Sequence, residues 1–341
     1  MTQPRRPTMA DVAAEAGVSR ALVSIVIRGA AGAGEATRAR VLEAAERLGY
    51  RPDARARLLR SSRSRLLGVV FDITGPYHTE LVGHLYPAAR TRGYGITLSA
   101  CGRAQSQHEA VHSLLDLGVE ALIILAPETP DEDLARLPVP VVSVFRPATH
   151  PDVASVASDE RAGVDLAMNH LLQLGHRRIA HVDGGDAVGA QPRRSAYLEF
   201  TSSRPGELEP PVVLSAGSEL SDGREAGARL LEEARRPSAV LVFNDVCALG
   251  VLQALLTNGV PVPEEVSVVG YDDASLAALA HVPLTSVNQQ GPDLAAAAVE
   301  AADAALAGEF RHVLIPPSLT VRASTGIPNT GDHMCEGAAS H

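Results

Sequence analysis

The sequence predicts an all-α N-terminal head followed by an α/β body of two lobes with parallel sheets. Three short amphipathic segments precede residue 50, and short apolar strands alternate with amphipathic helices from residue 66 onward. Charge divides the chain in the same way. Residues 1–65 hold thirteen arginines against six acids, or +7, although the whole chain of 341 residues carries −10. A basic head on an acidic body indicates that the head meets a polyanion.

Three helices are expected in the head. Thr8-Met9-Ala10-Asp11 has the form of a capping box that begins the first helix, and Ser19 is a good N-cap for a second helix from Arg20 to about Ile27. Only Gly17-Val18-Ser19 separates these two helices, which is the helix-turn-helix pattern. A third helix is expected from Glu35 to Leu48. Its inward residues are predicted to be Val41, Leu42, Ala45 and Leu48.

The segment after the head is predicted to be a hinge. Arg51-Pro52-Asp53 breaks the helical pattern, and Ala54 to Arg60 has room for one or two turns of helix. This hinge helix is too short and too charged to be stable alone. Ser61-Ser62-Arg63-Ser64 is typical of a polar linker.

The body is predicted to be two α/β lobes. Apolar strands joined by helical crossovers are typical of parallel sheets covered on both faces, and about 260 residues is large for one sheet. The expected strands are Gly68–Phe71, Gly95–Leu98, Ala121–Leu125, Val139–Val144, Ile179–Val182, Ala239–Phe243 and Val266–Val269. The expected helices span residues 79–92, 106–117, 160–174, 222–234, 247–258 and 293–306.

Composition favours a cytoplasmic protein with no membrane partner. No apolar run approaches the length of a membrane span, and the N-terminal residues lack the apolar core of a signal peptide. Cys101, Cys247 and Cys335 are odd in number and far apart, which is typical of reduced thiols in a cytosol.

The second helix of the head is the expected DNA-reading element. In a helix-turn-helix it enters the major groove by its N-terminal end, and an arginine there makes the bidentate contact to guanine. The exposed positions are predicted to be Arg20, Ala21, Ser24 and Arg28. The alternative is a three-helix domain whose arginines are merely solvated. The short turn and the +7 charge favour DNA binding.

Seven motifs spread over residues 8–326 point to a known family. The head holds Asp11-Val12-Ala13-x-x-Ala16-Gly17-Val18-Ser19-x-x-x-Val23-Ser24, Thr37-Arg38-x-x-Val41 and Leu48-Gly49-Tyr50-Arg51-Pro52. The body holds Gly68-Val69-Val70, Leu174-Gly175-His176-Arg177-Arg178-Ile179-Ala180, Phe243-Asn244-Asp245 and Gly270-Tyr271-Asp272-Asp273. Together they resemble the LacI/GalR family of bacterial transcriptional regulators. The resemblance implies a homodimer with a DNA-binding head, a hinge helix and an effector domain shaped like a periplasmic sugar-binding protein.

The resemblance also implies which residues contact DNA. It puts Arg20, Ala21 and Ser24 at base-reading positions, and Leu59 where a hinge leucine wedges into the central minor groove. Such a wedge unstacks a base step and bends the duplex onto flanking arginines. Ser19, Arg28, Arg55 and Ala56 complete the expected set. The chain departs from the family at Ile25, where many members have the Arg of Val-Ser-Arg-Val, so a contact made there is lost and Arg28 is the expected replacement.

An effector cleft is expected at the carboxyl ends of the strands, where α/β lobes bind their ligands. Asp72, Tyr77 and His78 follow the first strand of the body, and Asn244, Asp245 and Asp272 follow later ones. The resemblance adds Phe145, Asp159, Arg193 and Gln289 to the cleft, with Ala196 standing where the family usually has Gly. Carboxylates, amides and an arginine beside an aromatic ring suit a hydroxyl-rich ligand such as a sugar. The alternative for any one of these polar residues is a loop cap or a surface charge.

Three other functions compete with this interpretation. His108-Glu109-Ala110-Val111-His112 matches the H-E-x-x-H signature of zinc-dependent hydrolases, which needs a third ligand and a water-bearing cleft. No second signature marks that ligand, so a solvated helix face is favoured. Gly184 to Gly189 lacks the dinucleotide pattern, and no nucleophile elbow is present, so no catalytic residue, cofactor or metal is expected. A sugar-binding protein without a DNA role is disfavoured by the basic head.

The sequence therefore predicts a sequence-specific DNA-binding transcriptional regulator. We expect a repressor that binds a palindromic operator as a homodimer under control of a small hydroxylated effector, such as a sugar. The predicted organisation is a helix-turn-helix domain at 1–50, the hinge helix and linker at 51–65, the effector-binding and dimerisation domain at 66–326, and a disordered tail at 327–341.

Overall fold

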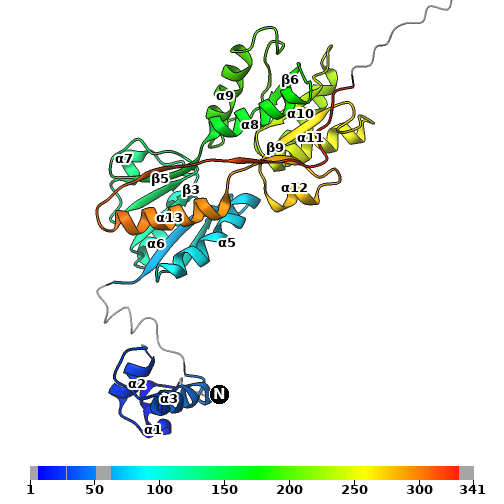
Figure 1. Cartoon of the computed structure of the whole chain (residues 1–341). Helices are drawn as coiled ribbons and strands as arrows, with labels where there is room; N and C mark the ends of the chain where they lie inside the picture. The colour runs from blue at the N-terminus through cyan, green and yellow to red at the C-terminus, as the bar shows by residue number, and fades with distance from the viewer. Residues whose placement is uncertain (1–6, 28, 51–62, 330–341) are drawn as a thin grey trace, which may run out of the picture. The chain divides into compact units, whose positions relative to one another are not determined.

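A computed structural model describes residues 7–27, 29–50 and 63–329 of the chain. The chain divides into two units, Met1–Ser64 and Arg65–His341 (Figure 1). The expected hinge helix and nearly all of the expected disordered tail lie outside the described residues.

The first unit contains the three expected helices, α1 (Met9–Ala16), α2 (Arg20–Ile27) and α3 (Glu35–Arg47). The capping box of α1 is formed in both directions. The backbone N–H of Asp11 donates to Thr8 Oγ1 at 3.4 Å, and that of Thr8 donates to Asp11 Oδ2 at 2.7 Å. Gly17 ends α1 in the left-handed conformation at φ 63°, which glycine adopts without a steric penalty. The helix-turn-helix prediction is confirmed.

The core of this unit is small and built mostly from valine and alanine. Its buried residues are Val12, Ala13, Ala16, Val23, Val26, Val41, Ala44 and Ala45. The prediction that Leu42 faces inward is wrong, because its side chain is 49% exposed. At 100° per residue the inward stripe of α3 runs through Val41, Ala44 and Ala45, and this stripe leaves Leu42 at its solvent edge.

The first lobe of the body is a parallel sheet of order β11-β5-β4-β3-β1-β2. Helices α5 and α13 pack with the core on one face, and α6 and α7 lie against the other. The strands are β1 (Leu66–Asp72), β2 (Gly95–Cys101), β3 (Ala121–Leu125), β4 (Val141–Val144), β5 (Ala154–Ser158) and β11 (His312–Ile315). The helices are α5 (Pro76–Thr91), α6 (Gln107–Asp116), α7 (Asp131–Leu134) and α13 (Gly291–Ala305).

The second lobe has the sheet order β12-β10-β9-β8-β6-β7, parallel except for β12. Helices α8 and α9 cover one face, and α10 and α11 cover the other. The strands are β6 (Ile179–Val182), β7 (Val212–Leu214), β8 (Ala239–Val242), β9 (Ser267–Asp272), β10 (Thr285–Asn288) and β12 (Ser318–Thr320). The helices are α8 (Glu160–Gln173), α9 (Ala190–Ser202), α10 (Leu220–Glu232), α11 (Asp245–Thr257) and α12 (Ser275–Leu279).

The backbones of α10 and α11 lie almost in contact. A Cβ at Gly223 would lie 1.9 Å from the carbonyl oxygen of Cys247, and one at Gly250 would lie 2.2 Å from that of Leu220. Only glycine allows so close an approach, so these positions fix how the two helices pack.

The chain crosses between the lobes three times, after β5, after β10 and after β11 (Figure 1). The crossings bring the carboxyl ends of both parallel sheets toward the same gap. Within the described residues no helix is long and apolar enough to span a membrane.

Candidate functional site

The amino end of α2 presents the predicted DNA-reading residues. Arg20 and Ala21 are exposed and Ser24 is half-buried. Ser19 acts as the expected N-cap, because its Oγ accepts the backbone N–H of Leu22 at 3.2 Å. Among the described residues Arg20 forms no ion pair or side-chain hydrogen bond, whereas Arg47 pairs with Glu15 at 3.4 Å. Arg20 is therefore available to an external partner.

The remaining DNA contacts stay predictions from the sequence. Arg28, Arg55, Ala56 and Leu59 lie outside the described residues. Ile25, which stands at the departure from the family pattern, is half-buried in α2.

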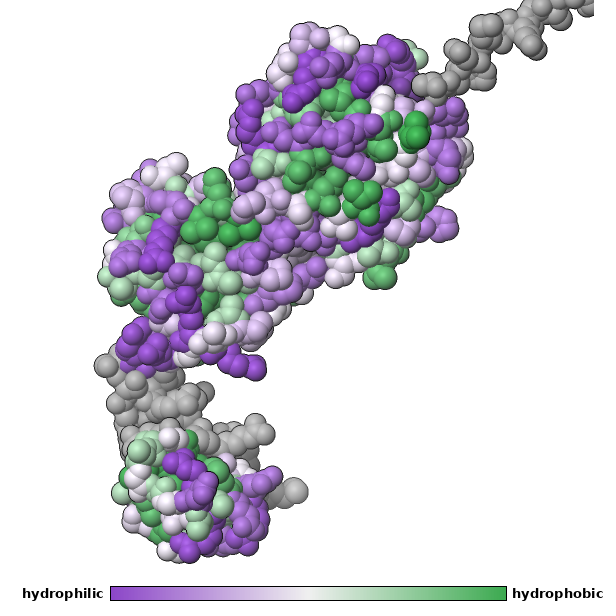
Figure 2. All heavy atoms as spheres, in the orientation of Figure 1, coloured by the Kyte–Doolittle hydropathy of each residue, from purple (hydrophilic) through white to green (hydrophobic). Residues whose placement is uncertain are grey.

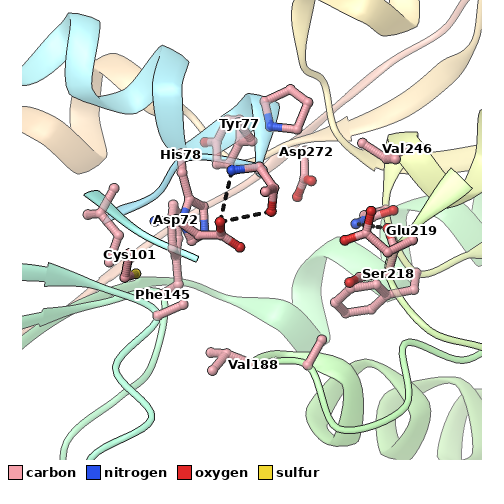
Figure 3. A pocket seen from close by; sticks show the side chains of 18 of the residues that line it. Asp72, Tyr77, His78, Cys101, Phe145, Val188, Ser218, Glu219, Val246 and Asp272 are labelled. Carbon is pink, nitrogen blue, oxygen red and sulfur yellow. Dashed lines mark hydrogen bonds between the residues drawn. The ribbon is translucent and has the colours of Figure 1, made fainter. Parts of the chain in front are cut away.

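A cavity of about 490 Å³ opens between the two lobes of the body (Figure 3). This volume is within the range of small-molecule sites. Loops after β1, β2, β3 and β4 line it from the first lobe, and loops after β6, β8, β9 and β10 line it from the second. Nine of the ten predicted effector residues line this cavity: Asp72, Tyr77, His78, Phe145, Arg193, Asn244, Asp245, Asp272 and Gln289.

Asp159 is the residue that does not line the cavity. Its carboxylate accepts the backbone N–H of Ala162 at 3.0 Å and caps the start of α8. We therefore correct its placement: Asp159 positions the helix, and its neighbour Glu160 faces the cavity.

Aromatic rings form one wall of the cavity. The ring of Phe145 lies 5.5 Å from that of Tyr77 and 5.2 Å from that of His78, measured between centroids. His78 Nδ1 accepts the backbone N–H of Asp72 at 3.3 Å. Burial lowers the pKa of His78 to about 4, so this ring is neutral at pH 7 and its Nε2 carries the proton.

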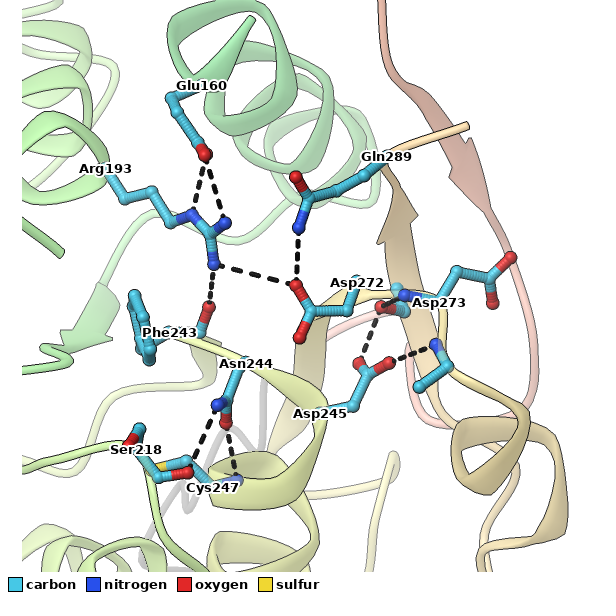
Figure 4. A network of polar contacts seen from close by, with 12 residues as sticks. Glu160, Arg193, Ser218, Phe243, Asn244, Asp245, Cys247, Asp272, Asp273 and Gln289 are labelled. Carbon is cyan, nitrogen blue, oxygen red and sulfur yellow. Dashed lines mark hydrogen bonds and ion pairs between the residues drawn. The ribbon is translucent and has the colours of Figure 1, made fainter. Parts of the chain in front are cut away.

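Arg193 is held rigidly at the other side of the cavity (Figure 4). Its Nε and Nη2 donate to the two carboxylate oxygens of Glu160 at 2.6 and 3.1 Å, and its Nη1 donates to the carbonyl of Phe243 at 2.6 Å. Its guanidinium carbon lies 3.6 Å from the ring centroid of Tyr271. Burial acts to lower the pKa of Arg193, but the charge of Glu160 holds it above the ordinary value.

Asp272 lies between Arg193 and Gln289. Its Oδ1 accepts the Gln289 side-chain amide at 2.6 Å and lies 3.9 Å from Arg193 Nη1. Burial raises the pKa of Asp272 to about 7, against the opposing effect of Arg193. Its φ of 107° is rare for a residue with a side chain, and Phe145 on the opposite wall has a φ of 72°. Such strained backbone is typical of ligand sites.

Two other predicted residues combine lining with local capping. Asp72 accepts the backbone N–H and the hydroxyl of Thr74, both at 2.8 Å. Asn244 caps α11 by accepting the N–H of Cys247 at 2.8 Å, and its amide donates to the carbonyl of Ser218 at 3.1 Å. Both residues therefore cap a local turn or helix, which was the alternative to ligand binding, and both also line the cavity.

Sequence reasoning missed Glu160, Asp186 and Glu219 as lining residues. Glu160 follows β5, a strand of alanine, serine and valine that lacked a strong apolar signal.

Ala196 is buried in α9 with the core of the second lobe. The departure from the family's glycine is therefore accommodated by packing.

The H-E-x-x-H motif lies on α6, and although Gln107 at the start of this helix lines the cavity, His108, Glu109 and His112 do not. His108 and His112 are exposed, with their Nε2 atoms 3.1 Å apart. Glu109 is the N3 partner of a capping box with Ser106, and these hydrogen bonds lower its pKa. Among the described residues no group of three or more His, Cys, Asp and Glu gathers to hold a metal ion.

The chain combines a helix-turn-helix unit, in which Arg20 is available to a partner, with a two-lobed α/β body that holds a polar cavity. Together these two parts define a DNA-binding regulator that takes a small ligand. Family models match both parts: "Bacterial regulatory proteins, lacI family" over residues 8–53 and "Periplasmic binding protein-like domain" over residues 168–325. The transcriptional regulator GalR of Salmonella typhimurium is 33% identical over 338 residues, covering 96% of this chain and 98% of its own length.

Solved structures agree with this assignment. The lac repressor dimer bound to operator and the anti-inducer ONPF is 28% identical with a TM-score of 0.79, covering 94% of this chain and all of its own. The complex of the regulator CelR with cellobiose is 30% identical with a TM-score of 0.68, at the same coverage. The chain belongs to the LacI family of bacterial regulatory proteins, and it is a DNA-binding transcriptional regulator.

Proposed function

We propose that this regulator is a repressor that binds a palindromic operator as a homodimer and responds to a carbohydrate in the cavity between its lobes. The observation that carries the proposal is the cavity itself, where an aromatic wall faces the fixed Arg193–Asp272–Gln289 set. Aromatic rings stack on the apolar face of a sugar ring, and carboxylate, amide and guanidinium groups bond its hydroxyls. The CelR relative is described in complex with cellobiose, and the other structure is a dimer on its operator.

A surface on the second lobe supports the homodimer. Apolar residues gather over α11 and α12 (Figure 2), around a second depression of about 210 Å³. Leu279 at the end of α12 is 84% exposed. An exposed apolar patch of this kind marks a protein contact, and a two-fold pair of such patches is self-complementary. The depression is lined by Leu249, Leu252, Gln253, Leu256, Thr257, Ala280, His281 and Val282.

The proposed control is a coupling between effector and operator. Binding of ligand closes the lobes, shifts the dimer geometry and releases or holds the hinge segment Ala54–Arg60. Such coupling is reciprocal and typically amounts to about 1–3 kcal/mol. The wedge role of Leu59 in that segment stays a sequence-based prediction.

The cavity is proposed to bind and not to catalyse, and the protein to act in the cytoplasm, where its DNA is. Cys101 lines the cavity, but burial raises the pKa of its thiol, so it is a poor nucleophile at pH 7. His78 is neutral, and its Nδ1 is already occupied by the backbone of Asp72. This arrangement does not supply an activated nucleophile with its base.

Selection of bound duplexes from a random library tests this function. At about 150 mM salt, non-specific phosphate binding is weak, so a near-palindromic consensus is the expected outcome. Repeating the selection with a panel of sugars then identifies the effector by loss or gain of bound duplex. No enriched sequence, with or without sugars, would overturn the proposal.

A further inference from the structure

The cavity is strongly acidic. Its basic lining residues are Arg193 and His78, and burial leaves His78 neutral. The chain contains no lysine. Beside the deeply buried Asp245, six carboxyl side chains line the cavity: Asp72, Glu128, Glu160, Asp186, Glu219 and Asp272.

The charge of Arg193 is already balanced. Glu160 takes its Nε and Nη2 in a bidentate ion pair, and the carbonyl of Phe243 takes Nη1. Both side chains of the pair are buried, at 6% and 9% exposure, so their mutual neutralisation is not screened by water. An anionic ligand would therefore find no free cation among the lining residues.

Among the described residues that line the cavity, the buried polar atoms that lack a hydrogen-bond partner are acceptors or can accept. Gln289 is 2% exposed, and its amide nitrogen is used by Asp272, so Oε1 is left buried without a hydrogen bond. Tyr77 is also buried, and its Oη has no partner within the described structure. Tyr77 and Asp272 both line the cavity, and a Cβ built on Gly291, two residues after Gln289, would lie 3.7 Å from the Tyr77 hydroxyl, so the three residues lie near one another. Buried polar atoms without partners are costly, which indicates that a ligand supplies the missing donors.

We infer that the effector carries a protonated amine, and that its ammonium group binds where Asp272, Gln289 and Tyr77 meet. An ammonium group offers three donors and one positive charge, which match the carboxylate, the amide oxygen and the phenol oxygen. The aromatic wall holds the rest of a hydroxylated ring. The chemical class is thus an amino sugar. This inference rests on the proposed function, because it assumes that the cavity holds a hydroxylated effector.

Matched sugars test the inference on the full-length protein. D-Glucosamine and D-galactosamine are each compared by calorimetry with their neutral parent, their N-acetyl derivative and the corresponding uronic acid. We expect the amine of at least one series to bind about tenfold tighter than its parent, since a charge-assisted hydrogen bond is roughly twice as strong as a neutral one. Equal or tighter binding of the parent, the N-acetyl sugar or the uronic acid overturns it, and so does the absence of binding by every compound.

Two variants separate charge recognition from general damage to the site. Asp272→Asn is expected to bring the amine-to-parent affinity ratio close to one. Glu225→Gln removes an exposed carboxylate of α10 that does not line the cavity, and it should leave the ratio unchanged. A ratio that survives Asp272→Asn overturns the assignment of the ammonium site.

The operator assay keeps the two proposals apart. If a neutral sugar releases the operator, the inference that the effector carries an amine is wrong, while the proposed function stands. Failure of the chain to bind any specific duplex rejects the proposed function, and the calorimetric ratio still decides on the amine.

Discussion

Arg193 and Glu160 form a buried, bidentate ion pair that joins α9 to the first residue of α8. The distances are 2.6 Å between Nε and Oε2 and 3.1 Å between Nη2 and Oε1. Because each charge has left water, each depends on the other for compensation. The pair also fixes the guanidinium plane, so that Nη1 faces Phe243 and Asp272.

Breaking this pair should destabilise the protein. Glu160→Gln leaves Arg193 buried with a neutral partner, and removing one member of a buried pair costs about 3 kcal/mol. Urea unfolding measures the loss. Glu199→Gln is the matched control on α9, because Glu199 pairs with Arg161 at an exposed surface and its loss should not be measurable. Equal effects of the two substitutions would contradict the role of burial.

Asp272 should give the unfolding free energy a specific pH dependence. Burial raises its pKa to about 7, whereas an aspartate in an unfolded chain titrates near 4. Between these values the folded state keeps a proton that the unfolded state has lost, so this contribution to stability falls as pH rises from about 4 to about 7. Asp272→Asn removes it, and the stability of the variant relative to the wild type should rise across that window.

The comparison with the wild type is needed because other groups act in the opposite direction. Burial lowers the pKa of His78 and of His181 to about 4, and both destabilise the fold as pH falls below about 6.5. Their effect is common to both proteins and cancels in the difference. A difference that stays flat from pH 4.5 to 7.5 would show that Asp272 titrates normally.

Arg20 is expected to carry sequence recognition. Arg20→Ala should weaken binding to the selected operator by roughly tenfold or more, equivalent to about 1–3 kcal/mol, and should relax the preference at one base pair. Fluorescence anisotropy on specific and random duplexes measures both. Arg47→Ala removes the same charge from α3, where Arg47 pairs with Glu15, and should weaken both duplexes slightly and equally. The same loss on both duplexes for Arg20→Ala would mean that Arg20 contacts only phosphate.

Gly223 should not tolerate a side chain. In Gly223→Ala the new Cβ meets the Cys247 carbonyl at 1.9 Å, so α10 and α11 must separate. Overpacking of this kind costs about 1–3 kcal/mol, visible as a lower thermal midpoint. Gly83→Ala in α5 meets nothing within 4 Å and should gain up to about 1 kcal/mol from helix propensity. Similar midpoints for the two variants would disprove the close contact.

Leu279 should contribute to self-association. Leu279→Asp places a charge on the patch over α11 and α12 and is expected to shift the protein toward the monomer in sedimentation experiments. Leu314→Asp is the control, because Leu314 is also exposed, at 59%, but lies on the edge strand β11 of the first lobe. An unchanged sedimentation profile for Leu279→Asp would move the proposed interface elsewhere.

Regular patterns made much of the fold predictable. The seven expected strands and six expected helices of the body all occur with ends shifted by a few residues, because continuous apolar runs and amphipathic helices are strong signals. β5 was missed, since Ala154–Ser158 is buried but only weakly apolar. α9 was missed because its buried face includes Arg193, whose burial depends on Glu160 from a distant segment.

The site was predictable where it follows from strand ends. Asp72, Asn244 and Asp272 line the cavity because residues at the carboxyl ends of parallel strands meet there. The separate roles of Asp159 and Glu160 were not predictable. The two carboxylates are adjacent at the start of α8 and differ only in where their side chains point, which the sequence does not show. Which of two carboxylates caps a helix and which faces a cavity is decided by tertiary packing.

The three crossings between the lobes have a consequence for synthesis. β11 and α13 belong to the first lobe, yet they follow every helix and all but one strand of the second lobe in the chain. A ribosome therefore releases β1–β5 long before the helix that covers their apolar face, whereas β6–β10 and their helices emerge as one uninterrupted stretch. The nascent first lobe must stay partly uncovered until about residue 315 is made. The first lobe is begun before the second, but it receives its last helix and strand only after most of the second lobe has been made.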